Sequence, residues 1–218
     1  IKVEVSMRKH AFVLLALIMM LVMGCRNTYI IPIPTDVYPG GGQDVDKVGQ
    51  DLGFEGGNGD ADTPFIIADV DQIENLMAHV AEGNDFSGKT FSLQPGVYPL
   101  YVFSGTTASI STLTDGTTSD WMGIGTKDTP FRGTFIGNDS VITGLNMNGN
   151  DTTEENAHGF FNYVGDGASI SGLTIEGDIA YDGTESVVGL LVGMVSSGTV
   201  TISDCHTRDT STVKGGTA

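Results

Sequence analysis

Short runs of alternating apolar and polar residues, broken by glycine, fill the second half of this chain. Successive side chains point to opposite faces of a β-strand, so these runs predict short strands with one buried face. Three of the runs align, in 137–145 (GNDSVITGL), 165–173 (GDGASISGL) and 198–205 (GTVTISDC). The alignment makes Ile142, Ile170 and Ile202 equivalent, at intervals of 28 and 32 residues. Intervals of this size indicate stacked units that share one core.

A second landmark keeps the same period, since Gly159-Phe160-Phe161 and Gly189-Leu190-Leu191 lie 30 residues apart. We therefore predict a mainly β fold, a right-handed parallel β-helix or related solenoid. An antiparallel sandwich would lack the fixed spacing. The residues expected to point into the core are Ile142, Leu145, Phe160, Ile170, Leu173, Leu190 and Ile202.

One amphipathic helix is predicted before these strands. A short strand at 64–67 leads to Asp69, a typical N-cap, and Gln72 completes a capping box. Apolar residues then follow at helical spacing as far as Ala81, and Gly83 ends the helix. Further strands are expected at 89–93 and 97–103.

The N-terminal segment has the form of a secretory signal. Met7-Arg8-Lys9-His10 is basic, and thirteen apolar residues follow at 11–23. A helix of that length covers about 20 Å, less than the roughly 30 Å of a bilayer core. We interpret 1–24 as a signal peptide, with residues 1–6 upstream of the start at Met7.

The signal ends in Leu21-Val22-Met23-Gly24-Cys25, which resembles a bacterial lipobox. The resemblance implies cleavage before Cys25 and attachment of lipid to its sulfur, so the predicted partner is a membrane. Arg26 at the following position favours the outer membrane or cell surface. The alternative is an ordinary signal peptide followed by a chance cysteine.

Residues 25–63 are predicted to form a flexible acidic tether, because proline and glycine are frequent and apolar periodicity is absent. Asp44, Asp46 and Glu55 match positions 1, 3 and 12 of a calcium-loop template, although Val48 occupies position 5, where Asp or Asn is expected. We favour a solvated acidic linker, with a calcium site as the alternative.

Composition supports the prediction of a β fold and limits the classes of binding partner that we expect. The chain has 218 residues, of which 31 are glycine, and a net charge of −17. Such a charge repels nucleic acid, so we expect no nucleic-acid partner. Two cysteines make no disulfide framework, and Cys205 is interpreted as a small buried side chain.

No catalytic or cofactor site is predicted. His79, His158 and His206 lie in unrelated contexts, and the chain has no serine-hydrolase, zinc-protease or Cys-x-x-Cys motif. Polysaccharide lyases and glycosidases with clustered carboxylates are the alternative, but 133–207 contains no Lys or Arg to assist a lyase. The carboxylates in question, which we favour as turn residues, are Asp166, Glu176, Asp178, Asp182 and Glu185. Aromatic residues that could stack on sugars, or pack in the core instead, are Tyr98, Tyr101, Trp121, Tyr163 and Tyr181.

Several segments resemble the GLUG-motif repeats of bacterial surface lipoproteins. They are the helix-then-strand segment 71–93, WMGIG at 121–125, PFRGTFIGN at 130–138, GFF at 159–161, GLLVG at 189–193 and 198–205. The resemblance covers about 62–218. It implies an extracellular β-helical region of adhesin-like proteins and no catalytic residues.

These observations predict a membrane-anchored cell-envelope lipoprotein, not an enzyme, whose GLUG-like β-helix domain spans 64–218. The domain would act as a stalk or binding module for a glycan or a host protein. The next landmark would fall near residue 219, so we expect a domain truncated at its C-terminus and a missing downstream domain.

Overall fold

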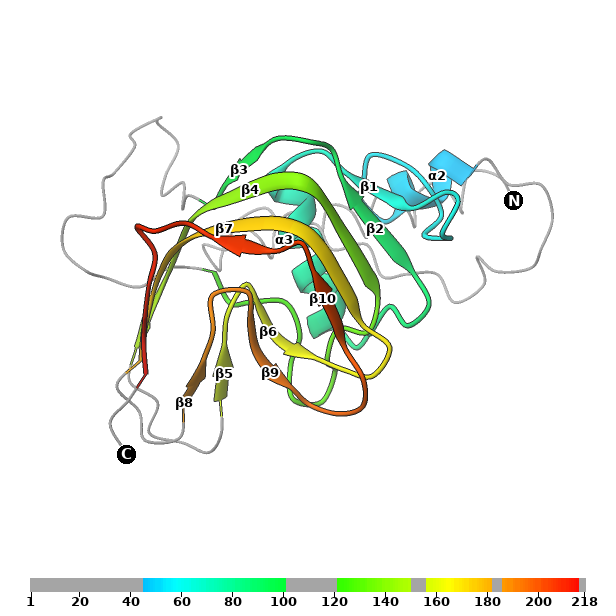
Figure 1. Ribbon diagram of the computed structural model, residues 1–218. Coiled ribbons are helices and arrows are strands. Elements are labelled where there is room, and N and C mark those ends of the chain that lie inside the picture. The colour runs from blue at the N-terminus through cyan, green and yellow to red at the C-terminus, as the bar shows by residue number, and fades with distance from the viewer. Residues whose placement is uncertain (1–44, 101–120, 150–155, 182–185, 216–218) are drawn as a thin grey trace, which may run out of the picture. The chain divides into compact units, whose positions relative to one another are not determined.

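The computed structural model describes residues 45–100, 121–149, 156–181 and 186–215, all of which belong to one unit of the chain. This part is mainly β, as predicted, and carries two helices (Figure 1). The helices are α2 (Val45–Asp51) and α3 (Val70–Ala81). The strands are β1 (Phe65–Ile67), β2 (Thr90–Leu93), β3 (Val97–Pro99), β4 (Thr134–Gly149), β5 (Asn156–His158), β6 (Phe161–Val164), β7 (Ser169–Tyr181), β8 (Ser186–Val188), β9 (Val192–Val195), β10 (Thr201–Ser203), β11 (His206–Thr207) and β12 (Thr212–Lys214).

Every ladder between these strands is parallel. The largest sheet has eight strands in the order β1-β2-β4-β7-β10, with β3 on β4 and with β11 and β12 on β7. Two small sheets pair β5 with β8 and β6 with β9. Parallel strands need long connections, and most of these ladders join segments about 30 residues apart, as the repeat predicted.

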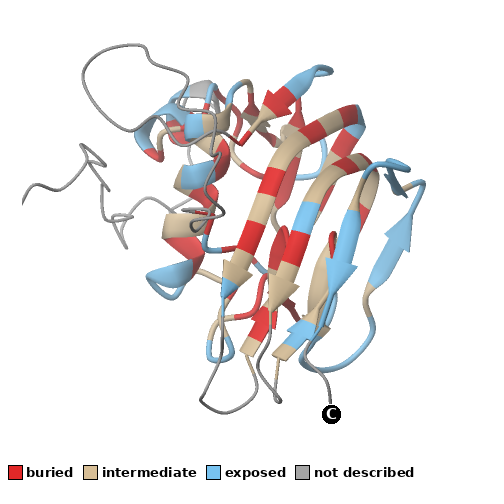
Figure 2. Ribbon diagram, turned by 90° about the vertical axis from the view of Figure 1, so that its left-hand side faces the viewer, coloured by how far each residue is buried: buried red, intermediate tan, exposed pale blue. Residues whose placement is uncertain are grey.

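The longest ladder joins β4 to β7, which run side by side (Figure 1). Its buried pairs match in type, with Phe135 opposite Ile170 and Met147 opposite Ile179. Buried positions alternate with less buried ones along the long strands (Figure 2). On the inner side, the ring centroid of Phe135 lies 5.4 Å from that of Phe161, so the core lies between the large sheet and the small ones.

The register of this ladder corrects one alignment from the sequence. Ile142 pairs with Ile175, and not with Ile170. The reason is a register shift after the pair Ile136–Ser171. The next pair is Ser140–Leu173, so β4 advances by four residues while β7 advances by two. Such a bulge adds residues to one strand of the pair and so shifts which residues lie opposite one another. The later alignment is confirmed, because Ile170 does pair with Ile202.

The bulge falls where the backbone turns through the left-handed region in three successive layers. Positive φ angles occur at Asn138 (51°) and Asp139 (59°) in β4, at Gly172 (66°) in β7, and at Asp204 (52°) after β10. Asn, Asp and Gly tolerate this conformation best. The Gly-Leu and Asp-Cys endings of the second and third sequence repeats are therefore equivalent turns.

Six of the seven predicted core residues are buried: Ile142, Leu145, Phe160, Ile170, Leu173 and Leu190. The prediction for Ile202 is wrong, since its side chain is 46% exposed. Among the described strands β10 pairs only with β7, so no further layer covers this residue.

Helix α3 confirms the predicted N-terminal helix. The Asp69 carboxylate accepts a hydrogen bond from the Gln72 backbone N–H at 2.9 Å. The Gln72 side chain in turn accepts from Ala68 N–H at 2.7 Å, one residue before the N-cap. Ile73, Leu76 and Val80 are the buried apolar stripe of this helix.

The tether prediction is wrong for residues 45–63, which form helix α2 and a folded loop. Val48, Leu52 and Phe54 are buried, and the Phe54 ring lies 5.2 Å from that of Phe65. Three apolar side chains within seven residues suffice to hold this Gly-rich stretch on the core. The folded region therefore begins before residue 64 and includes a second helix, while 25–44 lies outside the described residues.

Candidate functional site

Several residues singled out from the sequence fall outside the described part: Cys25, Asp44, the side chain of Asp46, Tyr101, Asp182 and Glu185. Glu55 is exposed, and its backbone N–H donates to Ile66 O at 2.9 Å. Within the described ranges no three His, Cys, Asp or Glu side chains lie close enough together to hold a metal ion. The calcium template therefore stays a sequence prediction.

The three histidines occupy different elements. His79 is buried on α3, where its Nε2 lies 3.0 Å from Leu52 O and therefore holds the α2 loop to the helix. His158 on β5 stacks on Tyr181, with ring centroids 3.5 Å apart and planes inclined by 9°. His206 is exposed on β11. The described contacts do not bring these rings together.

Three of the candidate carboxylates connect successive layers. Asp166 accepts from Thr199 N–H at 2.8 Å, and Asp178 accepts from Thr212 N–H at 3.1 Å. Glu176 Oε2 lies 3.4 Å from Arg208 Nε. In each case the partner comes 32 to 34 residues later in the chain. Asp166 lies in a turn, as predicted, whereas the turn interpretation is wrong for Glu176 and Asp178, which lie within β7.

The Glu176–Arg208 pair was missed from the sequence. Arg208 directly follows the stretch 133–207, which contains no Lys or Arg. In the structure it faces a carboxylate on β7, with Thr210 also 3.4 Å from Glu176 Oε1. The Arg208 side chain is 50% exposed and that of Glu176 33%, so this is a solvent-screened surface pair.

Most of the described candidate aromatic residues are core residues. Tyr98, Trp121 and Tyr163 are at most 7% exposed, and Trp121 stacks on Phe160 at 5.2 Å with planes inclined by 4°. The Tyr98 hydroxyl donates to Gln94 O at 2.6 Å and lies 3.1 Å from Ile67 O. Burial raises the pKa of Tyr98, and the nearby charge of Asp69 raises this pKa further. Tyr181, partly exposed against His158, is the remaining described candidate for stacking on a ligand.

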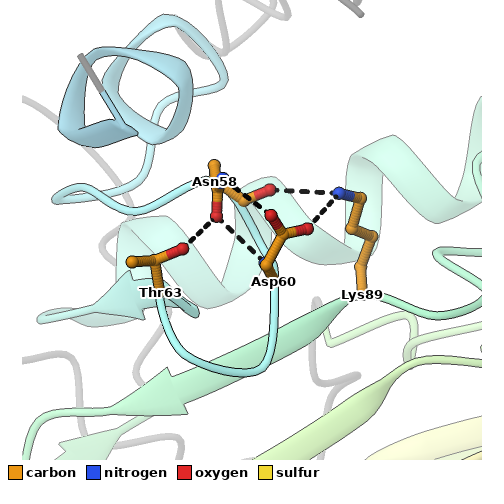
Figure 3. Close-up of polar contacts among 4 residues, drawn as sticks. All are labelled: Asn58, Asp60, Thr63 and Lys89. Carbon is orange, nitrogen blue, oxygen red and sulfur yellow. Dashed lines mark hydrogen bonds and ion pairs between the residues drawn. The ribbon is translucent and has the colours of Figure 1, made fainter. Parts of the chain in front are cut away.

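A polar cluster fixes the loop before β1 to the start of β2 (Figure 3). The Asn58 side chain accepts from Asp60 N–H at 3.1 Å and from the Thr63 hydroxyl. Lys89 Nζ donates to Asn58 O at 3.2 Å and to Asp60 Oδ1 at 3.1 Å. The Lys89 hydrogen bond and charge lower the pKa of Asp60. These contacts join residues 58–63 to Lys89, and we call them the clamp.

Cys205 is the free cysteine of the described part and is partly buried after β10. Burial raises the pKa of its thiol, and the Asp204 charge adds to that effect. A raised pKa lowers the fraction of reactive thiolate at neutral pH. The prediction of a small buried side chain is only partly met, because Cys205 is half-buried and lies between β10 and β11.

The outer face of the large sheet carries two rows of mostly hydroxyl side chains, which we call the hydroxyl ranks. One runs across paired strands through Thr134, Ser169 and Thr201, beside the buried Thr90 on β2. The other runs through Ser92, Ile136, Ser171 and Ser203, so that Ile136 interrupts its hydroxyls. These positions alternate with the buried residues Phe91, Phe135 and Ile170 along each strand. Adjacent strands place neighbours in a rank roughly 4.8 Å apart. Regular hydroxyls suit hydrogen bonding to a polar polymer.

The relative found among curated proteins is distant. Over 146 residues the chain is 27% identical to a protein of Evansella cellulosilytica described as "Putative Gly-rich membrane protein". The match covers 64% of this chain and 14% of that protein, so the chain spans about a seventh of the relative's length. No family model and no solved structure matches the chain. Within the described residues, no helix combines the length and apolar character needed to cross a membrane.

Proposed function

We propose that this chain is a lipid-anchored cell-envelope protein whose β region is a solenoid that serves as a stalk or binding module. The observation that carries the proposal is the parallel ladder between β4 and β7, in which matching side chains meet about 33 residues apart. A domain made of stacked repeats is elongated and presents an extended, regular surface. Both properties suit adhesion or ligand binding at a surface.

The proposed solenoid is a right-handed parallel β-helix. Three features support it: the parallel pairing in all three sheets, the left-handed turn at one corner of successive layers, and the continuous buried core. In a parallel β-helix each layer extends every sheet by one strand. The ladders β4-β7-β10, β5-β8 and β6-β9 follow that rule.

We also propose kinship with the GLUG-motif surface proteins. Two of the six segments that carry the resemblance are neighbours in the structure: Phe160 N–H donates to Leu190 O at 3.0 Å, and Phe161 N–H to Leu191 O at 2.9 Å. The repeat motif is thus a unit of the ladder. This supports a repeat origin, and the family name rests on the motifs alone.

The proposed anchor is the lipid on Cys25, at the outer membrane or cell surface. It rests on the apolar segment that ends at Cys25 and on the membrane-protein description of the distant relative. Replacing Cys25 by Ala should leave a precursor that is not processed and takes up no radiolabelled palmitate. Normal maturation and labelling of Cys25→Ala would contradict the anchor.

The proposed ligand is a glycan or a host protein that contacts the hydroxyl ranks. The test is an array of glycans and matrix proteins probed with the wild-type chain and with Ser171→Arg, which places a long charged side chain in the middle of a rank. Val97→Arg, on an exposed residue of β3, is the matched control. We expect Ser171→Arg to lose binding that Val97→Arg keeps. Equal binding by all three chains would contradict this face, and no binding by wild type would contradict a binding role.

A carbohydrate-active enzyme is the second candidate, and the specific observation for it is Arg208 beside Glu176. A basic group next to a carboxylate is the pair that proton abstraction from an acidic sugar requires. Incubation with acidic polysaccharides, read as new unsaturated or reducing ends, decides this. If the wild type produces such ends and both Glu176→Gln and Arg208→Gln fail to produce them, the enzyme proposal replaces the binding-module proposal.

A further inference from the structure

The clamp encloses one of the two Asn-Gly pairs of the chain, Asn58-Gly59, and the other pair is Asn148-Gly149. An asparagine followed by glycine is prone to deamidation, because a glycine nitrogen is little hindered when it attacks the side-chain amide. In that reaction the glycine nitrogen bonds to the asparagine Cγ and the Cγ–Nδ2 bond breaks, so that ammonia leaves with the proton of the glycine amide. Water then opens the succinimide ring to aspartate or isoaspartate.

The side-chain amide of Asn58 is engaged by the clamp (Figure 3). Asn58 Oδ1 accepts from Asp60 N–H at 3.1 Å and from the Thr63 hydroxyl, and Asn58 Nδ2 donates to Asp60 Oδ2 at 2.9 Å. Ring closure turns this side chain and makes Cγ tetrahedral. The three hydrogen bonds must then bend or break, and hydrogen bonds weaken steeply away from their preferred angles.

The attacking nitrogen of Gly59 is also restrained. Gly59 N–H donates to Thr63 O at 3.1 Å, and Gly59 O accepts from Thr90 N–H at 2.8 Å. Gly59 is buried, and a Cβ added to it would lie 2.3 Å from Cε2 of the Phe65 ring. The nitrogen therefore has to give up a hydrogen bond and move within a packed loop before it can attack Cγ.

Lys89 holds the clamp closed from the start of β2. Its Nζ lies 3.1 Å from Asp60 Oδ1 and 3.2 Å from Asn58 O. The side chain of Lys89 is 24% exposed and that of Asp60 is 62% exposed, so this ion pair is screened by solvent. Opening of such a surface contact is a local event that leaves the core folded.

The second Asn-Gly pair lies outside the clamp. Asn148 and Gly149 are the last two residues of β4, where Gly149 is exposed and pairs with Tyr181. None of the hydrogen bonds of the clamp involves this pair. Its reactivity therefore reports on the rest of the fold and serves as a reference within the same chain.

We propose that Asn58 is a modification site that the clamp controls, so that it stays intact while the clamp is closed and deamidates when the clamp opens. The product would keep the clamp open, because a second carboxylate replaces the amide that donates to Asp60, and like charges repel. A transient opening of loop 58–63 would thus become a lasting one. The inference goes beyond the proposed function, since neither the lipid anchor nor the hydroxyl ranks involve this loop.

The test compares deamidation at the two Asn-Gly pairs of the full chain at mildly alkaline pH. Mass spectrometry of the digested protein locates the replacement of NH2 by OH, and chromatography separates aspartate from isoaspartate peptides. In guanidinium chloride Asn58 and Asn148 should react at similar rates, because both are then unrestrained. In the folded wild type Asn58 should react at least about tenfold more slowly than in the unfolded chain, because only the open loop reacts.

Two variants open the clamp without touching the reacting groups. Lys89→Met removes the charge and Thr63→Val removes the hydroxyl. Each should raise the rate at Asn58 about fivefold, the factor that loss of one ordinary hydrogen bond gives, and leave the rate at Asn148 unchanged. The matched controls are Thr63→Ser, which keeps the hydroxyl, and Lys47→Met, which removes a charge from an exposed residue of α2.

The proposal is overturned if Asn58 reacts as fast in the folded wild type as in the unfolded chain, or if neither variant accelerates its reaction. It is also overturned if the rates at Asn58 and Asn148 rise together, since that result reports a loss of stability of the whole fold. Asn58→Gln should show no modification at this position, which confirms the assignment of the mass change.

Discussion

Ile202 pairs with Ile170 in parallel register, yet the two side chains have opposite environments: Ile170 is fully buried and Ile202 is 46% exposed. The pair isolates the effect of a neighbouring strand, because the two residues are of the same type and lie opposite one another in the same sheet. Ile170 has a paired strand on each side, β4 and β10, whereas among the described strands Ile202 has only β7 beside it.

This pair gives the first prediction. Ile170→Ala should lower the free energy of unfolding by about 2–5 kcal/mol, because it empties a site closed on all sides. Ile202→Ala should cost about 1 kcal/mol or less, because half of its surface is already in water. Urea unfolding measures both. Similar losses for the two variants would contradict the different burial of Ile170 and Ile202.

A second prediction concerns the close approach of β4 and β7 at Gly177. A Cβ added there would lie 1.9 Å from Leu145 O, a backbone atom that cannot turn aside. Gly177→Ala should therefore force the strands apart and cost about 1–3 kcal/mol or more. Gly96 is the matched control, since its added Cβ would meet nothing nearer than 3.7 Å. Gly96→Ala should be neutral or stabilise by about 0.4–1 kcal/mol, and a harmless Gly177→Ala would show that the ladder is wider than described.

A third prediction concerns the acid side of the stability curve. The pKa of Asp60 is lowered from its ordinary 3.8, first by the hydrogen bond from Lys89 and then by the Lys89 charge. A lowered carboxyl pKa stabilises the fold above the unfolded value, and this stabilisation is lost as the pH falls through the folded pKa.

The measurement is a carbon-13 NMR titration of the Asp60 carboxyl. Wild type should titrate below 3.8, and Lys89→Met should bring the midpoint back toward that value. Lys47→Met, on an exposed residue of α2, should leave the titration unchanged. An Asp60 that titrates at 3.8 or above in the wild type would show that the clamp of Figure 3 does not form in solution.

Local signals in the sequence predict a good part of this fold. Helix α3 was predicted over its full length because a capping carboxylate at Asp69 and an apolar stripe agree with one another. Six of the seven core positions follow from alternation between the two faces of a strand. The same pattern, broken by glycine, predicts short strands, whereas β4 and β7 run on for 16 and 13 residues.

Register and the edges of the fold were harder to predict. Residues 45–63 look like a linker because glycine dominates their composition, yet Val48, Leu52 and Phe54 bury enough apolar surface to order them. The register of Ile142 depends on two extra residues at a turn, which the repeat pattern does not reveal. Arg208 faces Glu176 only because the layers stack, so no local pattern marks that pair.

The central claim is that segments about 30 residues apart stack as parallel layers, and a thiol cross-link tests it most directly. Thr134 and Ser169 pair in β4 and β7, both on the outer face, so their Cα atoms should lie roughly 4.8 Å apart. With Cys205→Ser, a double variant with Thr134→Cys and Ser169→Cys should be joined by the shortest bifunctional thiol reagent. Thr134→Cys with Thr201→Cys, two strands apart and therefore about 10 Å distant, should not be joined within one chain. A link at 134–169 without one at 134–201 is the predicted result, and no link at 134–169 in the folded protein would contradict the stacked layers.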